Sequence, residues 1–515
     1  MGGRTVTSPN ESLRARLDSL RSWDADWAGL RVVVTGIGIS GFAAADTLIE
    51  LGARVVVVDS ATSETAVAQA DTLKIVGAAD VLLGPDAVEH LPLVDGEPAE
   101  LVVTSPGWRP DQALLAKAAR RHVAVWGDIE LAWRLNVRQG RKTPEWLTIT
   151  GTNGKTTTVG MTASILQAAG LKAIAVGNVG TPVLDALRDP VEYDVFAVEL
   201  SSFQLHWSES LSPLASVCLN VAEDHVDWHG SYQAYLADKA KVYTHTKVAA
   251  IYNAGQRETE AMVEEADVVD GCRAVAFTTD TPSLSMLGVV EDLLVDRAFV
   301  QERRTSAQEL ATLSDLGPVT ARHTVANALA AAGLARAYGV AAEAVQEGLR
   351  AYLPGDHRIQ AVAKQDGILW INDSKATNPH AADAALSAFK DVVWIAGGLA
   401  KGVQYDELLA AHRDRLKAVV LIGAESRELR EALERTLPDT AVVETLQEGS
   451  PADDGDAAMR RAVTAAREVA VPGDTVLLAP ASASMDQFAS YAHRGTAFID
   501  AVREVVLGQA ADSEG

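Results

Sequence analysis

The chain has 515 residues, which is too long for a single hydrophobic core and predicts about three domains. Hydrophobic residues make up 48% of it and charged residues 22%, a globular composition that argues against a mostly disordered chain and against a fibrous rod. With 45 Lys and Arg against 69 Asp and Glu, the formal net charge is −24, which disfavours binding of nucleic acid but allows phosphorylated small molecules held by a few local cations.

The first predicted elements form the beginning of a doubly wound sheet. Residues 31–35 predict a strand, 42–51 a helix and 54–58 a second strand, with a glycine-rich turn at 36–41. A later apolar run at 101–103 ends in Thr-Ser-Pro-Gly. We therefore expect a Rossmann-like domain at the N-terminus.

The glycine-rich turn has the spacing of a dinucleotide-binding fingerprint. Gly36, Gly38 and Gly41 are followed by Asp59 at the end of the second strand. Such a turn lets a pyrophosphate approach the N-terminus of a helix. Taken alone, this pattern is also compatible with an NAD-dependent oxidoreductase that carries an appended domain.

A second α/β pattern follows a polar linker at 138–144. Strands are predicted at 146–150, 195–198 and 216–219, and a helix at 326–338. The acidic segment 256–319 has weaker periodicity, and we expect an added hairpin or loop there without assigning its elements.

A third α/β pattern follows a break at 353–356. Its predicted strands, separated by helical stretches, lie at 368–372, 392–396, 418–422 and 475–479. The predicted fold class is α/β with three domains. These are a Rossmann-like domain at 1–140, a central P-loop ATPase-like domain at 146–354, and a C-terminal Rossmann-like domain at 355–515.

The clearest local motif is the phosphate loop at 150–157, Thr-Gly-Thr-Asn-Gly-Lys-Thr-Thr, between a predicted strand and a predicted helix at 159–169. Its glycines let successive backbone N–H groups wrap around an anion, and the helix N-terminus adds its positive end. Lys155 would reach the β- and γ-phosphates, and the Thr156 hydroxyl would bind Mg²⁺. The match to the general motif is incomplete, because Ile149 stands where that motif has its first glycine.

Two further polar residues follow strands of the same domain. Glu199 ends one predicted strand, and His225 follows another. Ligand sites in open α/β sheets form beyond the carboxyl ends of the strands, so both could join the phosphate loop in one metal–phosphate site. Each also has a plainer interpretation, Glu199 as a solvated acid and His225 as a loop histidine hydrogen-bonded to Asp224.

Six motifs in this order make the sequence resemble the Mur ligases, the ATP-dependent amide-bond ligases of peptidoglycan precursor synthesis. They are GTNGKTT (151–157), GNVG (177–180), ELSSFQL (199–205), NVAEDH (220–225), NDSKATN (372–378) and PASASMDQF (480–488). The resemblance covers residues 31–506 and implies ligation of D-glutamate to UDP-N-acetylmuramoyl-L-alanine. It implies that ATP phosphorylates the substrate carboxylate, that the amine of D-glutamate attacks the acyl phosphate, and that ADP and phosphate are released.

The resemblance assigns three groups of binding residues. For ATP they are Gly151, Thr152, Asn153, Gly154, Lys155, Thr156, Thr157, Asn327, Arg358 and Asp373. For the UDP-linked substrate they are Thr35, Gly36, Gly38, Ser40, Gly41, Asp59, Ser105, Pro106, Gly107, Asn178, Ser201 and Gln204. For D-glutamate they are Thr377, Lys401, Ser484 and Tyr491. Two departures from the family pattern are Thr324 after His323, where the family often has Asn, and Tyr491 in place of Phe.

The resemblance also implies two Mg²⁺ sites and four catalytic residues. Thr156 and Glu199 would bind the first Mg²⁺, and His225 and a carbamylated Lys239 the second. Lys241 is the rival for carbamylation. The catalytic residues would be Lys155, His225, Lys239 and Lys375, the last neutralising the reacting carboxyl and phosphate groups.

Three alternatives stay open at this point. One is a ligase of the same architecture that adds another amino acid or extends folate, one is the oxidoreductase named above, and one is a binding protein without activity. The presence of Lys155, Glu199, His225 and Lys239 disfavours the last. Two cysteines, the lack of a signal peptide and the lack of a long apolar run predict a cytoplasmic enzyme without a transmembrane segment, and the resemblance implies a monomer.

Overall fold

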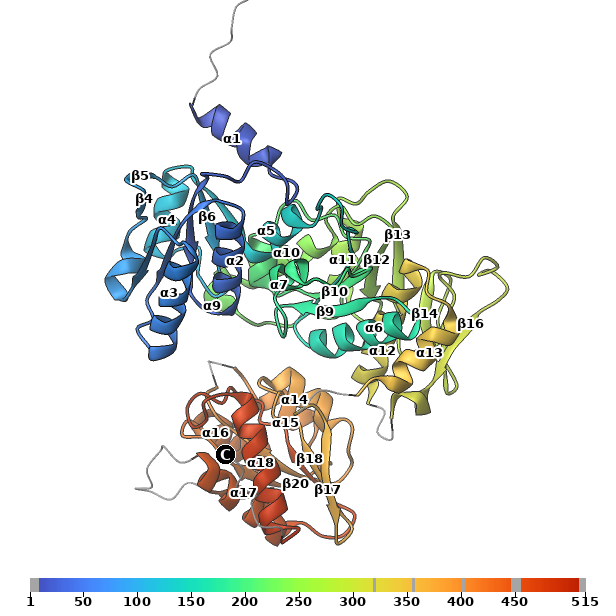
Figure 1. The fold of residues 1–515 in the computed structure, drawn as a ribbon. Coiled ribbons are helices and arrows are strands. Elements are labelled where there is room, and N and C mark those ends of the chain that lie inside the picture. The colour runs from blue at the N-terminus through green and yellow to red at the C-terminus, as the bar shows by residue number, and fades with distance from the viewer. Residues whose placement is uncertain (1–8, 318–320, 354–356, 401–402, 446–454, 509–515) are drawn as a thin grey trace, which may run out of the picture. The chain divides into compact units, whose positions relative to one another are not determined.

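The computed structural model describes residues 9–317, 321–353, 357–400, 403–445 and 455–508. The chain divides into two compact units, Met1–Asp315 with Ala326–Tyr352, and Leu316–Val325 with Leu353–Gly515. The first unit holds two large sheets and the second unit holds one (Figure 1).

The first sheet has five parallel strands in the order β3-β2-β1-β6-β7. Its central strands are rich in valine and buried, as expected for a parallel sheet with helices on both faces. The strand order reverses between β1 and β6, and the glycine-rich turn leaves β1 at this switch point, where open α/β sheets bind ligands. The strands are β1 (Arg31–Thr35), β2 (Arg54–Asp59), β3 (Asp80–Leu83), β6 (Leu101–Thr104) and β7 (Ala124–Gly127), with a separate pair β4 (Leu93–Val94) and β5 (Glu97–Pro98). The helices are α1 (Pro9–Ser19), α2 (Ile39–Glu50), α3 (Glu64–Val76), α4 (Ala113–Arg120) and α5 (Asp128–Leu135).

The second sheet has nine strands in the order β16-β15-β14-β13-β12-β11-β8-β10-β9. Strands β9 to β13 and β8 pair in parallel, which brings the carboxyl ends of β8, β10 and β11 to one edge. They are β8 (Glu145–Thr150), β9 (Ala173–Gly177), β10 (Val195–Glu199), β11 (Ala215–Cys218), β12 (Ala249–Asn253) and β13 (Arg273–Phe277). The helices are α6 (Lys155–Ala168), α7 (Val183–Arg188), α8 (Ser202–His206), α9 (Val226–His229), α10 (Tyr232–Ala240), α11 (Arg257–Glu264), α12 (Arg322–Tyr338) and α13 (Ala342–Ala351).

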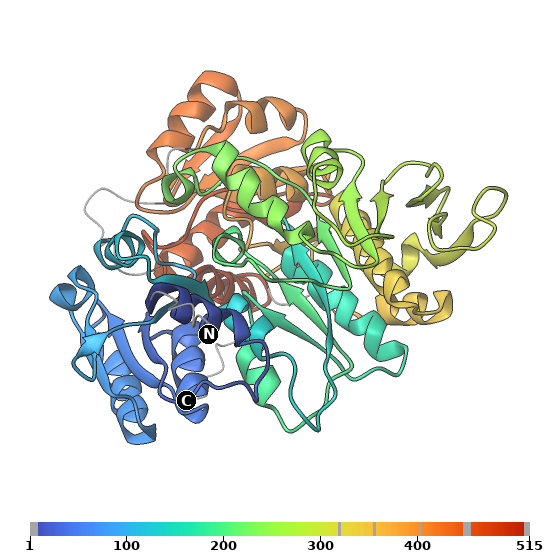
Figure 2. The same cartoon turned by 90° about the horizontal axis from the view of Figure 1, so that it is seen from above.

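An antiparallel extension completes the second sheet. Strands β14 (Met286–Val290), β15 (Leu293–Asp296) and β16 (Gln308–Thr312) pair antiparallel with one another. In both views of the fold they lie at the edge of the first unit that is farther from the first sheet (Figures 1 and 2). The segment 256–319, for which a hairpin or loop was expected without assigned strands, thus contains an antiparallel hairpin.

The second unit contains a six-stranded sheet in the order β17-β18-β22-β19-β20-β21, in which only β17 and β18 pair antiparallel. Separate apolar clusters cover its two faces. The strands are β17 (Gln360–Gln365), β18 (Ile368–Asn372), β19 (Val392–Ala396), β20 (Leu416–Leu421), β21 (Ala441–Glu444) and β22 (Thr475–Leu478). The helices are α14 (Pro379–Leu386), α15 (Asp406–Ala411), α16 (Arg427–Thr436), α17 (Gly455–Val469) and α18 (Tyr491–Val505).

The predicted α/β class is confirmed. Each predicted strand begins within two residues of the first residue of an observed strand. Helix α6 begins at Lys155, four residues before the predicted start. The loop ends at Gly154, which has a left-handed backbone conformation, and the helix follows directly. The first two sheets share one compact unit, so the predicted boundary between residues 140 and 146 stays a prediction. Among the described residues, no helix has the length and apolar character needed to cross a membrane.

Candidate active site

The loop between β8 and α6 is shaped by its glycines. Gly151 and Gly154 have φ values of 151° and 84°, which residues with a Cβ rarely adopt. A methyl group on Gly154 would lie 2.5 Å from Oδ1 of Asn327, the predicted adenine contact. Lys155 to Thr157 form the first turn of α6, so their backbone N–H groups open onto the loop and can bind an anion.

Residues that follow β11 anchor this loop. The Asn220 side chain accepts a hydrogen bond from the Asn153 N–H at 2.9 Å and donates one to the Asn153 carbonyl at 3.0 Å. The Thr152 hydroxyl accepts from the Ala222 N–H at 3.0 Å and contacts the Tyr235 hydroxyl at 2.8 Å. The motif that supplies His225 therefore also fixes the shape of the phosphate loop.

Two ammonium groups meet at one carbonyl of the loop. The Nζ atoms of Lys155 and Lys239 both donate to the Gly151 carbonyl, at 2.8 and 2.9 Å. Lys239 is 2% exposed, and burial together with the charge of Lys155 lowers its pKa to about 7. Two cations crowded at a phosphate loop indicate a site prepared for negative charge.

Glu199 lies at the end of β10 and is buried. Its Oε1 accepts a hydrogen bond from the Asn178 side chain at 3.0 Å, which joins two predicted site residues. Its Oε2 is buried and has no hydrogen-bond partner among the described residues. An unpaired buried carboxylate oxygen is costly, so this atom indicates a missing ligand rather than the solvated acid of the plainer interpretation.

His225 precedes α9 in a left-handed conformation, with φ of 52°. Its side chain is about half exposed, its ring lies 4.8 Å from that of Phe203, and its Nε2 lies 3.6 Å from Asp224 Oδ2. Burial and the charges of Lys239 and Lys155 lower the pKa of His225, although Asp224 opposes them. A lowered pKa keeps the imidazole neutral at neutral pH, which is the form that binds a metal.

The chemistry of these groups fits a hard divalent cation. Glu199 supplies an unpaired carboxylate oxygen, Thr156 a hydroxyl and His225 a neutral imidazole. A nucleotide in the phosphate loop would add phosphate oxygens. The described donor set is therefore compatible with Mg²⁺ bound together with a phosphate.

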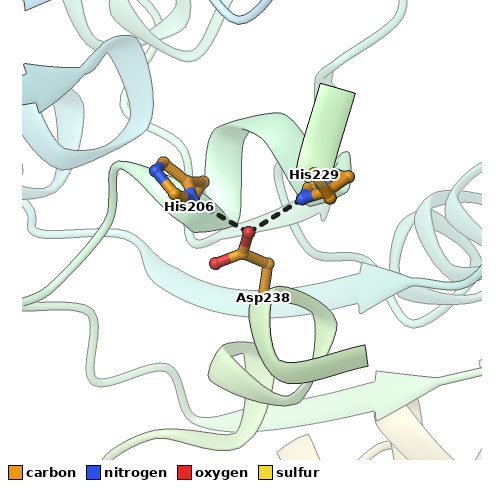
Figure 3. A group of neighbouring side chains, drawn as sticks. All are labelled: His206, His229 and Asp238. Atoms are coloured by element: carbon orange, nitrogen blue, oxygen red, sulfur yellow. Dashed lines mark hydrogen bonds and ion pairs between the residues drawn. The ribbon is translucent and has the colours of Figure 1, made fainter. Parts of the chain in front are cut away.

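A second polar cluster lies beside this site and holds α8, α9 and α10 together (Figure 3). Asp238 Oδ2 lies 2.8 Å from His206 Nδ1 and 2.9 Å from His229 Nδ1, and Asp238 Oδ1 lies 2.9 Å from Lys241 Nζ. Burial would raise the pKa of Asp238, but the hydrogen bonds from His206, His229 and Lys241 outweigh it and lower the pKa.

An ionised carboxylate only accepts hydrogen bonds, so both Nδ1 atoms of this cluster carry protons. His229 Nε2 lies 3.0 Å from the Ser202 hydroxyl, which leaves no open ligand atom on that ring. His206, His229 and Asp238 are close enough together to bind one metal ion, but the ammonium group of Lys241 contacts the Asp238 carboxylate. We interpret the cluster as a hydrogen-bonded brace and not as a metal site.

The glycine-rich turn of the first sheet is also tightly built. Gly36 has φ of 93°, and a methyl group on Gly41 would lie 2.0 Å from the Gly36 carbonyl oxygen. Asp59 holds the turn by accepting from the Ile37 N–H at 2.7 Å and the Ala61 N–H at 2.8 Å. Gly38 and Ser40 lie at the start of α2, on the ligand side of the switch point.

The loop after β6 faces that turn. Ser105 Oγ is buried without a partner among the described residues, and a methyl group on Gly36 would lie 2.5 Å from it. Pro106 is partly buried and Gly107 is exposed. Thr35 is fully buried, and its hydroxyl donates a hydrogen bond to the Thr104 hydroxyl at 2.8 Å. The proton of the Thr35 hydroxyl is therefore shared with a neighbouring strand of the sheet.

Ser201 and Gln204 form a capping box at the start of α8. The Ser201 hydroxyl accepts from the Gln204 N–H at 3.2 Å, and Gln204 Oε1 accepts from the Ser201 N–H at 3.1 Å. Gln204 Nε2 donates to Asp128 Oδ2 at 3.1 Å. Asp128 was not predicted from the sequence, because the contact joins residues 76 positions apart.

In the second unit, Asp373 and Lys375 follow β18. Burial raises the pKa of Asp373 to about 7, although the Ile359 N–H and Arg358 lower it. Lys375 Nζ donates to the Tyr491 hydroxyl at 3.0 Å and lies 4.5 Å from its ring centre, so two residues predicted for the same reaction are in contact.

The remaining predicted residues of this unit lie in its loops. Thr377 is partly buried in the loop that carries Lys375, and Ser484 is 4% exposed. Lys401 lies outside the described residues. Sequence reasoning missed Arg494, which is 1% exposed and donates to the Ser374 carbonyl at 2.9 Å and the Ser482 carbonyl at 3.1 Å. This arginine ties together the two loops that carry the predicted D-glutamate residues.

Comparison with protein families gives two matches. Residues 149–335 match the Mur ligase middle domain, and residues 357–482 match the Mur ligase, glutamate ligase domain.

Similar curated proteins match along nearly the whole chain. A Streptomyces coelicolor protein named UDP-N-acetylmuramoylalanine--D-glutamate ligase is 54% identical over 93% of this chain and 99% of its own length. Proteins of the same name from Thermobifida fusca and Leifsonia xyli are 50% and 49% identical, over 92% and 96% of this chain and 98% and 97% of their own.

Solved structures share the fold at low sequence identity. The UDP-N-acetylmuramate-alanine ligase MurC from Thermotoga maritima has a TM-score of 0.52 at 18% identity, covering 92% of this chain and 99% of its own. MurF from Acinetobacter baumannii has a TM-score of 0.57 at 17% identity, covering 92% of this chain and 94% of its own.

Proposed function

The chain belongs to the Mur ligase family, and from this premise we propose how its residues carry out the reaction. It is an ATP-dependent ligase that joins D-glutamate to UDP-N-acetylmuramoyl-L-alanine in peptidoglycan synthesis. The observation that carries this function is the match to ligases of that name over more than nine-tenths of the chain. The use of ATP also supports a cytoplasmic location.

The reaction must activate a carboxylate, which is a poor electrophile. In the proposed sequence, the carboxylate oxygen of the alanyl group attacks the γ-phosphorus of ATP, and ADP leaves. The amine of D-glutamate then attacks the acyl phosphate carbon, loses a proton, and phosphate leaves from the tetrahedral intermediate. The protein mainly positions these anionic groups and neutralises their charge.

We assign the ATP phosphates to the loop Gly151 to Thr157. Its N–H groups at the start of α6 would bind the phosphate oxygens, and Lys155, held over the loop by its carbonyls, would neutralise the β- and γ-phosphates. Asn327 beside Gly154 is assigned to adenine. In the second unit, Arg358 is assigned to phosphate and Asp373 to ribose.

We assign Thr156 and Glu199 to a first Mg²⁺, and His225 with Lys239 to a second. When bound, Mg²⁺ would offset the negative charge that builds up between carboxylate and phosphate. The unpaired Oε2 of Glu199 supports the first assignment. The Asn178 amide holds the other oxygen of Glu199 and so fixes its orientation.

Lys239 would serve the second site as a carbamate. An amine adds to CO₂ only when neutral, and a pKa of about 7 leaves a large neutral fraction at physiological pH. The addition forms an N–C bond, releases a proton, and turns a buried cation beside Lys155 into an anion. This change would remove the repulsion at the Gly151 carbonyl and create a carboxylate-like oxygen ligand.

The substrates occupy the two remaining groups of residues in this proposal. The uridine diphosphate would bind at the turn from Gly36 to Gly41 and the Ser105 loop, with Asn178, Ser201 and Gln204 towards its alanyl end. D-glutamate would bind in the second unit at Thr377, Lys401, Ser484 and Tyr491, with Lys375 neutralising the reacting groups. The Ser105 hydroxyl, which has no partner among the residues that the structure describes, and the contact of Lys375 with Tyr491 support these assignments.

A phosphate-release assay with UDP-N-acetylmuramoyl-L-alanine, ATP and a panel of amino acids tests the function. We expect release with D-glutamate and none with L-glutamate, L-alanine or a diamino acid. Release with L-alanine or a diamino acid in place of D-glutamate would overturn the assignment. The Lys155→Ala variant serves as the inactive control.

A further inference from the structure

Helix α5 carries two buried carboxylates whose surroundings differ. Glu130 is fully buried and both of its oxygens have partners: the Ser210 hydroxyl lies 2.6 Å from Oε1, and the N–H groups of Glu209 and Ser210 lie 2.9 Å from Oε2. The Arg134 guanidinium also donates to Oε1 at 2.7 Å. Glu130 therefore has all the partners that a structural carboxylate needs.

Asp128, two residues earlier, is only half satisfied. It is 8% exposed, and its Oδ2 accepts from Gln204 at 3.1 Å. Its Oδ1 is buried and has no hydrogen-bond partner within the described parts of the chain. Because leaving such an atom unpaired is costly, the contrast with Glu130 indicates that Oδ1 is reserved for a ligand.

The position of Asp128 is fixed by close packing of its helix against the end of α8. The Gly127 N–H donates to the Trp207 carbonyl at 3.1 Å, and a methyl group on Gly127 would lie 3.0 Å from Trp207 Cβ. Asp128 follows directly and is held against Gln204. If the side chain turned away, Oδ2 would lose its hydrogen bond to Gln204.

This contact fixes the amide of Gln204. Gln204 Oε1 accepts from the N–H and the hydroxyl of Ser201 at 3.1 and 3.3 Å, while Nε2 donates to Asp128. Only one orientation of the amide satisfies both sides, because an inverted amide would place an acceptor against the carboxylate. Asp128 thus sets the direction in which Gln204 presents its groups.

On its other side Asp128 is near Ser40, at the start of α2. Burial raises the pKa of Asp128 to about 6, while the Gln204 amide and the nearby Ile129 N–H and Ser40 lower it, so the group is an ionised acceptor at neutral pH. Of these neighbours, Gln204 alone makes a hydrogen bond of normal geometry among the described residues, and it does so to Oδ2. In the proposed function, Ser40 binds the diphosphate and Gln204 lies towards the alanyl end. In the substrate, the amino sugar joins these two parts, so a residue between Ser40 and Gln204 borders the sugar.

We infer that Asp128 is a further substrate-binding residue, whose Oδ1 accepts a hydrogen bond from a hydroxyl or amide N–H of the N-acetylmuramoyl group while Oδ2 fixes Gln204. This inference rests on the proposed placement of the UDP-linked substrate. The chemistry is selective, because a buried carboxylate attracts hydrogen-bond donors and repels phosphate. Asp128 therefore marks the point along the pocket where the diphosphate ends and the sugar begins.

Calorimetric binding of UDP-N-acetylmuramoyl-L-alanine and of UDP alone separates this role from a structural one. In Asp128→Asn an amide N–H₂ replaces an acceptor oxygen, and we expect affinity for the full substrate to fall about tenfold or more while affinity for UDP is unchanged. In steady-state assays, KM should rise for this substrate and stay constant for ATP and D-glutamate.

Two matched variants control the experiment. Glu130→Gln, on the same helix, should lower the melting temperature without changing the ratio of the two dissociation constants. Asp71→Asn, an exposed carboxylate of α3, should change neither. Asp128→Ala, which leaves no polar group, should give the same selective loss as Asp128→Asn.

Equal weakening of UDP and of the full substrate in both Asp128 variants would overturn the inference, as would unchanged binding of both ligands. A wild-type protein that binds UDP but not UDP-N-acetylmuramoyl-L-alanine would contradict the proposed function itself, and the inference with it.

Discussion

Asp238 and Lys239 are neighbours on helix α10, yet they face two different kinds of polar environment. Asp238 faces the brace, where His206, His229 and Lys241 satisfy both of its oxygens. Lys239 faces the phosphate loop, where it shares a carbonyl with another cation. Nearby, a buried oxygen of Glu199 has no hydrogen-bond partner in the described part of the chain. The difference teaches that complete hydrogen bonding marks polar groups that stabilise the fold, and incomplete pairing marks those that await a ligand.

Replacing Lys239 tests the incompletely paired groups at the phosphate loop and should have the largest effect. We expect Lys239→Ala to lower kcat about 10²- to 10³-fold, because a charged group next to the phosphates is lost. A short carboxylic acid such as acetate should restore part of the activity by occupying the space of the carbamate. Near-normal activity of the variant without added acid would contradict the role of Lys239.

The unpaired oxygen of Glu199 should matter next. Glu199→Gln keeps the size and the contact with Asn178 but removes the charge, and we expect an activity loss of about 10²-fold at fixed Mg²⁺. Part of the loss should be recovered by raising the Mg²⁺ concentration, which a Mg²⁺ titration of phosphate release would measure. A loss that is independent of Mg²⁺ would argue against a metal at this carboxylate.

Replacing Asp238 tests the fully hydrogen-bonded brace, and the expected effect there is on stability. Asp238→Asn should lower the free energy of unfolding by about 2 kcal/mol, because two histidine donors lose a charged acceptor. The pKa of Asp238 is lowered in the folded protein, so its contribution is present above the unfolded pKa of about 3.9 and is lost as the pH falls through its folded pKa.

Urea denaturation at neutral and acidic pH measures this effect. The difference between wild type and Asp238→Asn should shrink as the pH falls below about 4, because Asp238 of the unfolded chain then binds a proton while the folded carboxylate is still ionised. A variant that is as stable as the wild type at pH 7 but inactive would reverse the comparison, since the brace would then belong to the chemistry.

The site at the phosphate loop could be predicted from the sequence, whereas the hydrogen-bonded brace around Asp238 could not, for a physical reason. The phosphate loop, Glu199 and His225 follow strands in a fixed order, and parallel strands bring their carboxyl ends to one edge. Asp238, His206 and His229 are on three short helices, and nothing in their spacing shows that they meet. The contact of Asp128 with Gln204 was hidden in the same way, because it joins two sheets through the packing of Gly127 on Trp207.

The strands of the extension β14 to β16 could not be assigned from the sequence, for a different reason. They have four or five residues each, pair mainly with one another, and include Gly288 and acidic residues that weaken the alternation of apolar side chains. By contrast, the valine-rich strand β1 was predicted with its observed bounds, because it is buried on both faces and reads as a continuous apolar run. Patterns of burial are visible in sequence, whereas pairing at an edge is not.

Lys241 gives the smallest expected effect and the sharpest control for Lys239. It lies two residues further along the chain, and its ammonium contacts Asp238 Oδ1 at 2.9 Å and the His206 carbonyl at 3.0 Å. Its side chain is 37% exposed, so water can replace these contacts, and Lys241→Ala should cost only about 0.5 kcal/mol of stability. Its kcat should match the wild type with or without acetate, since its amine is on the brace and not at the phosphate loop. If Lys241→Ala rather than Lys239→Ala lost activity and recovered it with acetate, the carbamate would belong to Lys241. The assignment of Lys239 to the phosphate loop and of Lys241 to the brace would then be reversed.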